Sequence, residues 1–163
     1  MAMTAEVPRP SVPPPVREEP DSRRFQIPDL DRHAQWFMPR FRKAYPHLNE
    51  RQAISFLRAI VYSNEFLFLF QEDGVALAQA MGAAALDASA VIWERFVWVK
   101  DPNDKEQVEN ASYFYKEFAR WGQRQNIPIL HVEEGMTDVP RALIRERIGV
   151  VHTTEQRYVE LKG

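Results

Sequence analysis

Val91-Ile-Trp-Glu-Arg-Phe-Val-Trp-Val-Lys100 is followed by the break Asp101-Pro-Asn-Asp104 and, further on, by Ile127-Pro-Ile-Leu-His-Val132. The first run is rich in β-branched and aromatic residues, which is typical of a strand. Between the two runs, apolar residues recur at helical spacing and predict a helix over residues 106–125. A strand, a helix and a strand in succession imply a parallel pair joined by a right-handed crossover.

A second block of strands lies before this unit. The run Glu65-Phe-Leu-Phe-Leu-Phe-Gln71 is too short and too aromatic for a helix, and it predicts a strand buried on both faces. The turn Asp73-Gly74 leads back into Val75–Met81, which predicts an antiparallel hairpin. Antiparallel pairing here and parallel pairing in the later unit together predict an α/β fold with a mixed, mainly antiparallel sheet.

Helices are predicted on either side of these strands. Apolar residues at three- and four-residue spacing predict a helix over residues 29–45, which Pro39 should kink or end early. Asn49 is the expected N-cap of a second helix, and a last helix is predicted over about residues 138–148. A final strand is expected at Tyr158–Leu161, which gives the order ααβββαβαβ.

Side-chain alternation along the long central strand predicts what covers the sheet. By the period of two, Trp93 and Trp98 point to opposite faces, and Glu94 shares a face with Ile92 and Phe96. Large aromatic side chains on both faces need cover, so helices are expected on each side of the sheet.

The composition fits one folded domain. The chain has 163 residues, of which 45% are hydrophobic and 12% aromatic, well above the content of a disordered chain. A formal net charge of -2 supplies no general attraction to nucleic acid or to an anionic membrane. The absence of cysteine excludes disulfides and thiol nucleophiles, and the four histidines lack metal-ligand spacing. No apolar stretch is long enough to span a membrane, so a soluble protein is expected.

The N-terminus differs from the rest of the chain. Half of the twelve prolines precede residue 21, mixed with Arg, Glu and Ser and with almost no large apolar side chain. Such a composition buries too little surface to fold alone, and it predicts an extended arm over residues 1–24 followed by a domain over residues 25–163. The arm is either a disordered tail or a segment that orders on a partner.

The helix after the long strand carries Gln107-Val-Glu-Asn110-Ala-Ser112 near its start. With the order of elements over residues 25–163, this stretch resembles the GNAT-type N-acetyltransferases. In that family the corresponding segment reads Q/R-x-x-G-x-G/A, and its backbone N–H groups hold the pyrophosphate of acetyl-CoA. Gln107 matches the motif, whereas Asn110 and Ser112 replace its small residues and reduce the close approach that glycine permits.

The resemblance also implies where acid–base residues would lie. A glutamate on the fourth strand is a common base in the family, and Glu94 stands there, on an apolar face that would raise its pKa. The alternative is a structural glutamate that pairs with Arg95 or with other neighbours in space. The tyrosine that the family places in its last helix is replaced by Ile144, which cannot transfer a proton.

These residues leave two functions open. The first is a non-catalytic GNAT-like structural or interaction protein without a cofactor, resembling the acetyltransferase-like virion proteins of bacteriophages. It would belong to a virion and contact other protein subunits through residues 1–24. The second is a cytoplasmic N-acetyltransferase that uses acetyl-CoA, with Glu94 as base and Gln107, Asn110 and Ser112 as cofactor contacts. Neither function calls for a metal, a membrane span or a nucleic-acid partner.

Overall fold

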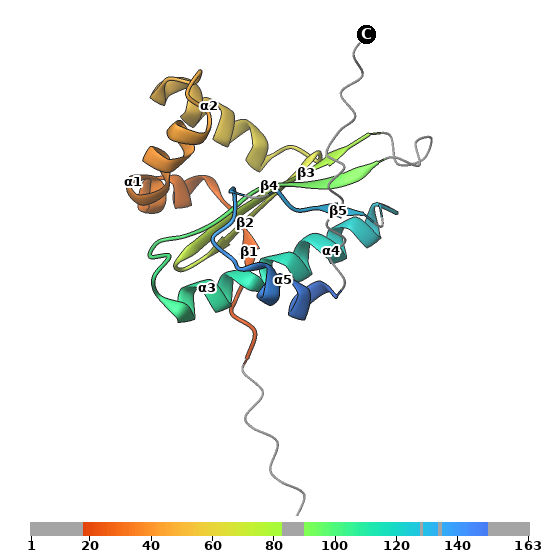
Figure 1. Cartoon of the computed structure of the whole chain (residues 1–163). Helices are drawn as coiled ribbons and strands as arrows, with labels where there is room; N and C mark the ends of the chain where they lie inside the picture. Colours follow the sequence, from red (N-terminus) through yellow and green to blue (C-terminus); the bar gives the residue numbers. More distant parts are fainter. Residues whose placement is uncertain (1–17, 83–89, 128, 134, 150–163) are drawn as a thin grey trace, which may run out of the picture.

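A five-stranded sheet forms the middle layer of the protein (Figure 1). The computed structural model describes residues 18–82, 90–127, 129–133 and 135–149. The elements in chain order are β1 (Arg23–Arg24), α1 (Ile27–Ala44), α2 (Glu50–Val61), β2 (Phe66–Gln71), β3 (Gly74–Met81), β4 (Val91–Val99), α3 (Lys105–Ser112), α4 (Phe114–Arg124), β5 (Leu130–His131) and α5 (Arg141–Ile148).

The sheet has the mixed pairing that the sequence predicts. Its strands lie in the order β1-β2-β3-β4-β5, with the first four antiparallel. β5 runs parallel to β4, with Ile92 opposite Leu130 and Trp93 opposite His131. The helices α3 and α4 form the crossover between this parallel pair, as the strand–helix–strand pattern requires.

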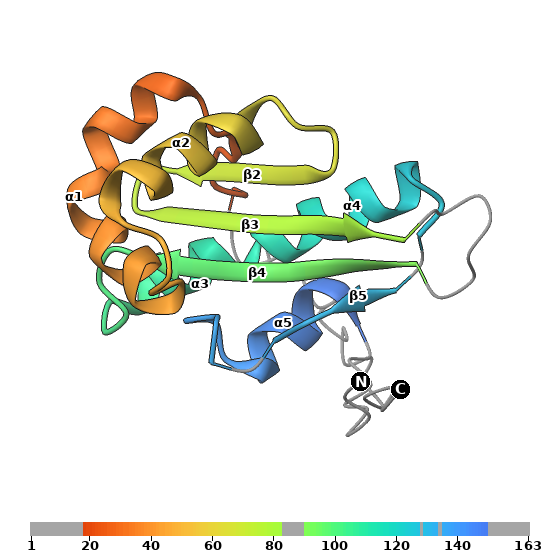
Figure 2. The same cartoon turned by 90° about the horizontal axis from the view of Figure 1, so that it is seen from above.

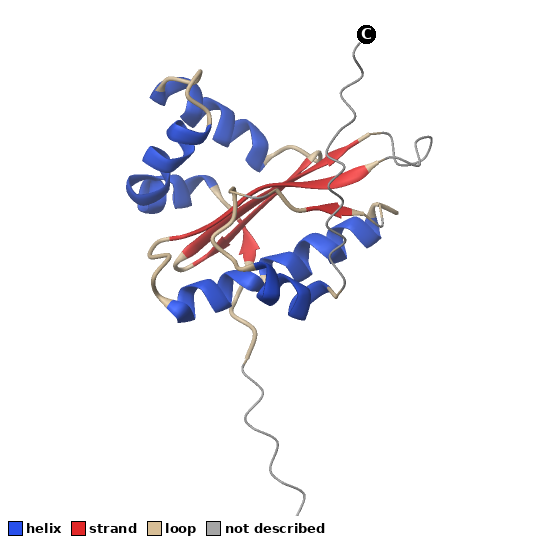
Figure 3. Cartoon of the chain, viewed as in Figure 1, coloured by secondary structure: helices blue, strands red, loops and turns tan. Residues whose placement is uncertain are grey.

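Helices cover both faces of the sheet, which confirms the predicted layers. α1 and α2 lie on one face, and α3, α4 and α5 lie on the other (Figures 2 and 3). Each side has its own apolar core, one containing Phe37, Phe41 and Trp98 and the other containing Phe114 and Phe118. None of the helices within the described ranges is long and apolar enough to cross a membrane.

A β-bulge in β4 changes the direction of its side chains. Ala78 of β3 pairs with Glu94 and Leu77 pairs with Phe96, so Arg95 is the extra residue of the bulge. Because one extra residue reverses the alternation, Glu94 and Phe96 point to opposite faces. By the same shift, Trp93 and Trp98 lie on the same face, so that prediction is wrong. Glu94 shares its face with Ile92, as predicted, but not with Phe96.

The predicted helix over residues 106–125 is two helices, α3 and α4, which meet at Tyr113. The Ser112 hydroxyl donates to the carbonyl of Glu109, which is the acceptor that the Tyr113 N–H would use in a continuous helix. The Tyr113 N–H bonds instead to the carbonyl of Asn110. A side chain that competes for a backbone carbonyl therefore accompanies the break.

Two other predictions concern the ends of elements. α1 continues through Pro39 to Ala44 and changes direction along its length (Figure 2), so the proline does not end it. β1 was not expected, because the pair Arg23–Arg24 carries no strand pattern of its own. The expected final strand, Tyr158–Leu161, lies outside the described residues.

Candidate functional site

Glu94 is the only acidic residue among the fully buried large side chains of the described chain. The β4 strand directs its carboxyl toward α4, where Oε1 accepts a hydrogen bond of 2.9 Å from the Tyr115 hydroxyl. Its Oε2 is buried and makes no hydrogen bond to any described residue. An unsatisfied buried oxygen is costly, so this position requires an explanation in terms of protonation.

A chain of hydrogen bonds links Glu94 to the segment that follows β5. The hydroxyls of Tyr115 and Thr137 lie 2.7 Å apart, and the Thr137 Oγ1 accepts from the Val139 N–H at 3.1 Å. Each hydroxyl has one proton, so Thr137 donates to Tyr115 when Tyr115 donates to Glu94. This chain of hydrogen bonds joins β4, α4 and the segment after β5. Of its members, only Glu94 was predicted from the sequence as a candidate site residue.

Burial controls the ionisation of this group. Burial raises the pKa of Glu94 well above its usual range. The hydrogen bond from Tyr115 opposes this rise, and the nearby Glu133 carboxylate adds to it. Burial also raises the pKa of Tyr115, and the neighbouring Glu94 adds to that rise. Burial therefore favours the protonated form of both groups, and Glu94, which has no exposed surface, is poorly placed to act as a general base through water.

The edge of β4 beyond the bulge is covered by residues Met136–Asp138, which we call the closing segment. Val97 donates its N–H to the Met136 carbonyl at 3.0 Å and accepts from the Asp138 N–H at 2.9 Å. The Asp138 carboxylate accepts from the Val99 N–H at 2.9 Å and forms a two-bond ion pair with Arg40 of α1. Hydrogen bonds from the closing segment thus use the backbone groups of Val97 and Val99 along this edge. A ligand could hydrogen-bond to β4 there only by replacing them.

We expect Asp138→Ala to lower the free energy of unfolding by about 3 kcal/mol, because it leaves Arg40 without its carboxylate and the Val99 N–H without an acceptor. Urea denaturation measures the loss. Asp138→Asn is the matched control: it keeps an oxygen for Val99 and should cost less. Equal stability of Asp138→Ala and the unchanged protein would contradict the role of this carboxylate.

The N-terminus of α3 is already capped by the chain itself. The Asp104 carboxylate accepts from the backbone N–H groups of Glu106 and Gln107. The Gln107 side chain accepts in turn from the Asp101 N–H at 2.7 Å. The amides and positive helix end that a pyrophosphate would need are therefore occupied by an anion, and these residues do not fit that group.

The other two residues of the predicted motif lie inside α3 and connect it to neighbouring elements. The Asn110 carbonyl accepts from Gln71 of β2, and the buried Ser112 hydroxyl accepts from Arg147 of α5 at 2.9 Å. Glu94 lies one layer away, bonded to Tyr115. The structure thus places Gln107, Asn110 and Ser112 along one helix without gathering them around Glu94.

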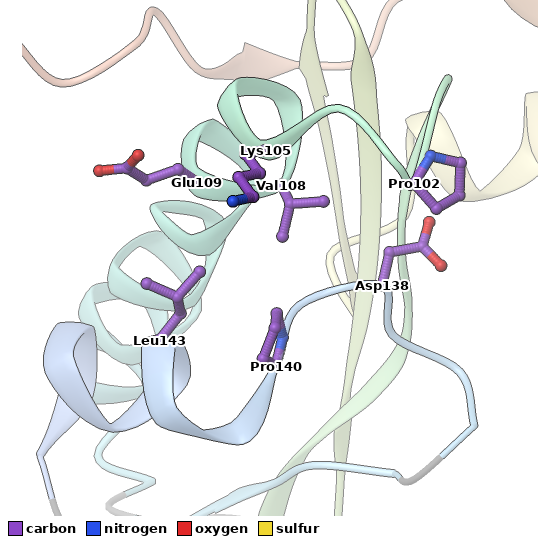
Figure 4. Close-up of a pocket in the computed structure, with 7 residues that line it drawn as sticks. All are labelled: Pro102, Lys105, Val108, Glu109, Asp138, Pro140 and Leu143. Carbon is purple, nitrogen blue, oxygen red and sulfur yellow. The ribbon is translucent and has the colours of Figure 1, made fainter.

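A pocket of about 360 Å³ lies beside the first turns of α3 (Figure 4). Asp138 of the closing segment forms part of its wall, while the next residue toward the N-terminus, Thr137, belongs to the hydrogen-bond chain of Glu94. The closing segment therefore contributes both to the wall of the pocket and to the hydrogen-bond chain of Glu94. The lining residues are Pro102, Lys105, Val108, Glu109, Asp138, Pro140 and Leu143.

Sequence reasoning missed several residues of this region. Asp104 could have been found, since an aspartate just before a helical pattern is a standard N-cap signal. Tyr115, Thr137 and Asp138 carry no local signal, because their roles depend on partners far away in the sequence. Ile144, which stands where the family has a tyrosine, is buried in the apolar core. Within the described ranges, no three metal-binding side chains come together.

Two solved structures similar to this chain are an acetyltransferase and a possible acetyltransferase. A possible acetyltransferase from Clostridium difficile 630 superposes with a TM-score of 0.56 at 13% identity, over 86% of this chain and 96% of its own. An aminoglycoside N-acetyltransferase in complex with CoA gives 0.54 at 13% identity, over 88% and 95%. No family model and no curated protein matches the sequence. The fold is thus of the GNAT acetyltransferase type.

Proposed function

We propose that this chain is a GNAT-fold protein that does not transfer acetyl groups and acts through contacts with other protein subunits. The observation that carries the proposal is the Asp104 carboxylate at the N-terminus of α3, where the family resemblance puts the pyrophosphate of acetyl-CoA. A second anion at this helix end would be repelled by the Asp104 carboxylate. Two of the backbone N–H groups that it would need, those of Glu106 and Gln107, are already bonded to Asp104.

The closing segment supports the same proposal. A cofactor held at the start of α3 would have to extend along β4 from Val99 toward Glu94 to deliver an acetyl group. That edge is bonded to Met136 and Asp138, and Glu94 is sealed behind Tyr115. Reaction at Glu94 would therefore first require the closing segment to leave the sheet.

We expect acetyl-CoA to give no saturable binding at sub-millimolar concentration, because the α3 amides are capped and the β4 edge is covered. Titration calorimetry and a thermal-shift series measure this directly. A ligand at a hundredfold over its dissociation constant would stabilise the fold by about 2.7 kcal/mol, so binding would be visible. Micromolar binding would overturn the proposal. In that case Asn110→Gly should strengthen acetyl-CoA binding and Gln107→Ala should weaken it.

The alternative is an acetyl-CoA-dependent N-acetyltransferase with a variant pyrophosphate loop. The fold favours this alternative, and so does the similar aminoglycoside N-acetyltransferase, which was solved in complex with CoA. In this reading Glu94 is the base and Gln107, Asn110 and Ser112 contact the cofactor. Loss of acetyl transfer in Glu94→Gln, with acetyl-CoA binding retained, would support the alternative over the non-catalytic proposal.

We further propose that the assembly is a bacteriophage virion, with residues 1–24 as the contact to neighbouring subunits. This step follows from the resemblance to acetyltransferase-like virion proteins and from the proline-rich composition of the arm. It is tested by mass spectrometry of purified particles from the source. Recovery of the chain only in the soluble fraction, away from any particle, would return the cytoplasmic alternative to first place.

A further inference from the structure

The described start of the chain runs across the α3–α4 layer in a definite direction. At Ser22 it lies beside the end of α3, because the Gln71 amide donates both to the Ser22 hydroxyl and to the Asn110 carbonyl, each at 2.9 Å. At Glu19 it lies over α4, where the carboxylate pairs with Lys116 at 3.0 Å and with Arg120 at 3.9 Å. Figure 1 shows this segment leaving the sheet and passing the α3–α5 layer.

This direction leads away from the chain's own pocket. The pocket lies at the beginning of α3, beside Lys105 and Val108, whereas the chain moves from Asn110 toward Arg120 as it is followed back to Glu19. A proline-rich segment is stiff and extended, so it does not readily turn back over a few residues. Docking of the arm in the pocket of its own chain would need such a reversal.

The remaining arm is long enough to reach another molecule. Residues 1–17 precede Glu18, and 17 residues in polyproline geometry extend about 50 Å at 3.1 Å per residue. A domain of this size has a radius of gyration of only about 14 Å. The arm can therefore cross its own domain and meet the next one.

The pocket and the arm are complementary in chemistry. Four of the seven lining residues are apolar or proline, namely Pro102, Val108, Pro140 and Leu143. The arm offers Pro8, Pro10, Val12 and the run Pro13-Pro14-Pro15. Proline segments dock in apolar grooves with little loss of chain entropy. The Glu109 carboxylate is 42% exposed and lies 4.0 Å from Arg147 of α5, and Arg9 and Arg17 flank the prolines of the arm.

We propose that the pocket between α3 and α5 receives residues 8–15 of a neighbouring copy of this chain. The contact joins two different surfaces, the arm of one copy and the pocket of the next, so it propagates into a ring or an open chain of subunits. This inference rests on the proposed function, in which the arm acts between subunits, and it names the surface on which the arm acts.

The absence of cysteine from the sequence permits a direct test by disulfide trapping in the full-length chain. One preparation carries Val12→Cys in the arm, and a second, distinguishable by mass, carries Leu143→Cys in the pocket. The two are mixed reduced and then oxidised mildly. The control replaces the pocket cysteine by Tyr62→Cys, which is 78% exposed at the end of α2 on the other layer. We expect about tenfold more mixed dimer from the pocket pair than from the control pair, because only cysteines held close together form the bond efficiently.

The outcomes separate this inference from the proposed function. Equal trapping at Leu143 and Tyr62 would overturn the inference, as would a double variant Val12→Cys/Leu143→Cys that forms only an internal cross-link. If acetyl-CoA also failed to bind, the non-catalytic proposal would still stand. Saturable acetyl-CoA binding together with equal trapping at Leu143 and Tyr62 would overturn both, whereas saturable binding with selective trapping at Leu143 would overturn only the non-catalytic proposal. If Leu143→Cys altered the circular dichroism spectrum, Pro140→Cys at the exposed start of α5 is the second position, with the same expectation.

Discussion

Glu94→Gln is expected to stabilise the protein at neutral and alkaline pH and to flatten the pH dependence of its stability. Burial raises the pKa of Glu94 in the folded protein well above the value of 4.5 that it has when exposed to solvent. The folded state therefore binds this proton more tightly than the unfolded state does. Stability is greatest below the unfolded pKa and falls as the pH rises toward the folded pKa.

The expected size of this effect is large. A single group with a raised pKa contributes a slope of about 1.4 kcal/mol per pH unit between its unfolded and folded pKa values. The unchanged protein should thus lose stability steadily as the pH rises from the unfolded pKa toward the raised folded pKa. Glutamine cannot ionise, so Glu94→Gln should lack this slope while keeping an oxygen for Tyr115.

Urea denaturation from pH 4.5 to pH 8.5 measures the two profiles. Glu133→Gln is the matched control, because its carboxylate only adds to a shift that burial dominates, so most of the slope should remain. A slope in Glu94→Gln equal to that of the unchanged protein would show that the buried carboxyl of Glu94 does not govern it. Identical slopes in all three proteins would point to other titrating groups.

Removal of residues 1–24 is expected to cost about 2–3 kcal/mol, whereas removal of residues 1–22 should cost little. The difference lies in Arg23, which forms a two-bond ion pair of 2.7 Å with Asp29 and stacks on Phe70. Asp29 is only 2% exposed, so loss of Arg23 leaves a buried carboxylate without its partner. Residues 18–22 contribute the exposed pair of Glu19 with Lys116, which is worth little. They also contribute the Ser22–Gln71 hydrogen bond, and without it the Gln71 amide keeps its bond to the Asn110 carbonyl.

The pH dependence of the two truncations provides the check. Burial alone would raise the pKa of Asp29, but hydrogen bonds from Arg23 and from the Gln26 backbone N–H outweigh it and lower the pKa. The stability from this pair is therefore present above the ordinary pKa of 3.8 and is lost as the pH falls through the lower folded value. The gap between the truncations should close in acid. Equal melting of both at pH 7 would exclude a structural role for Arg23.

Part of the candidate site follows from the sequence and part does not. The position of Glu94 on a buried strand and the N-cap at Asp104 both depend on neighbours within a few residues, so local patterns can reveal them. The Arg40–Asp138 pair joins residues 98 positions apart. Nothing near either residue indicates the other, and the covered edge of β4 was accordingly not predicted.

The sequence by itself determined the α/β class and the mixed sheet, because these depend on the spacing of apolar residues along each element. It also predicted helices on both faces, although the bulge in β4 breaks the alternation of Trp93 and Trp98 from which they were inferred. Only the tertiary structure decided which way the side chains of β4 point, since the bulge at Arg95 arises from pairing with β3. It also decided that Asp138 closes the edge of β4 and that Tyr115 covers Glu94. These contacts join distant segments whose approach depends on the packing of the whole chain, which no local pattern encodes.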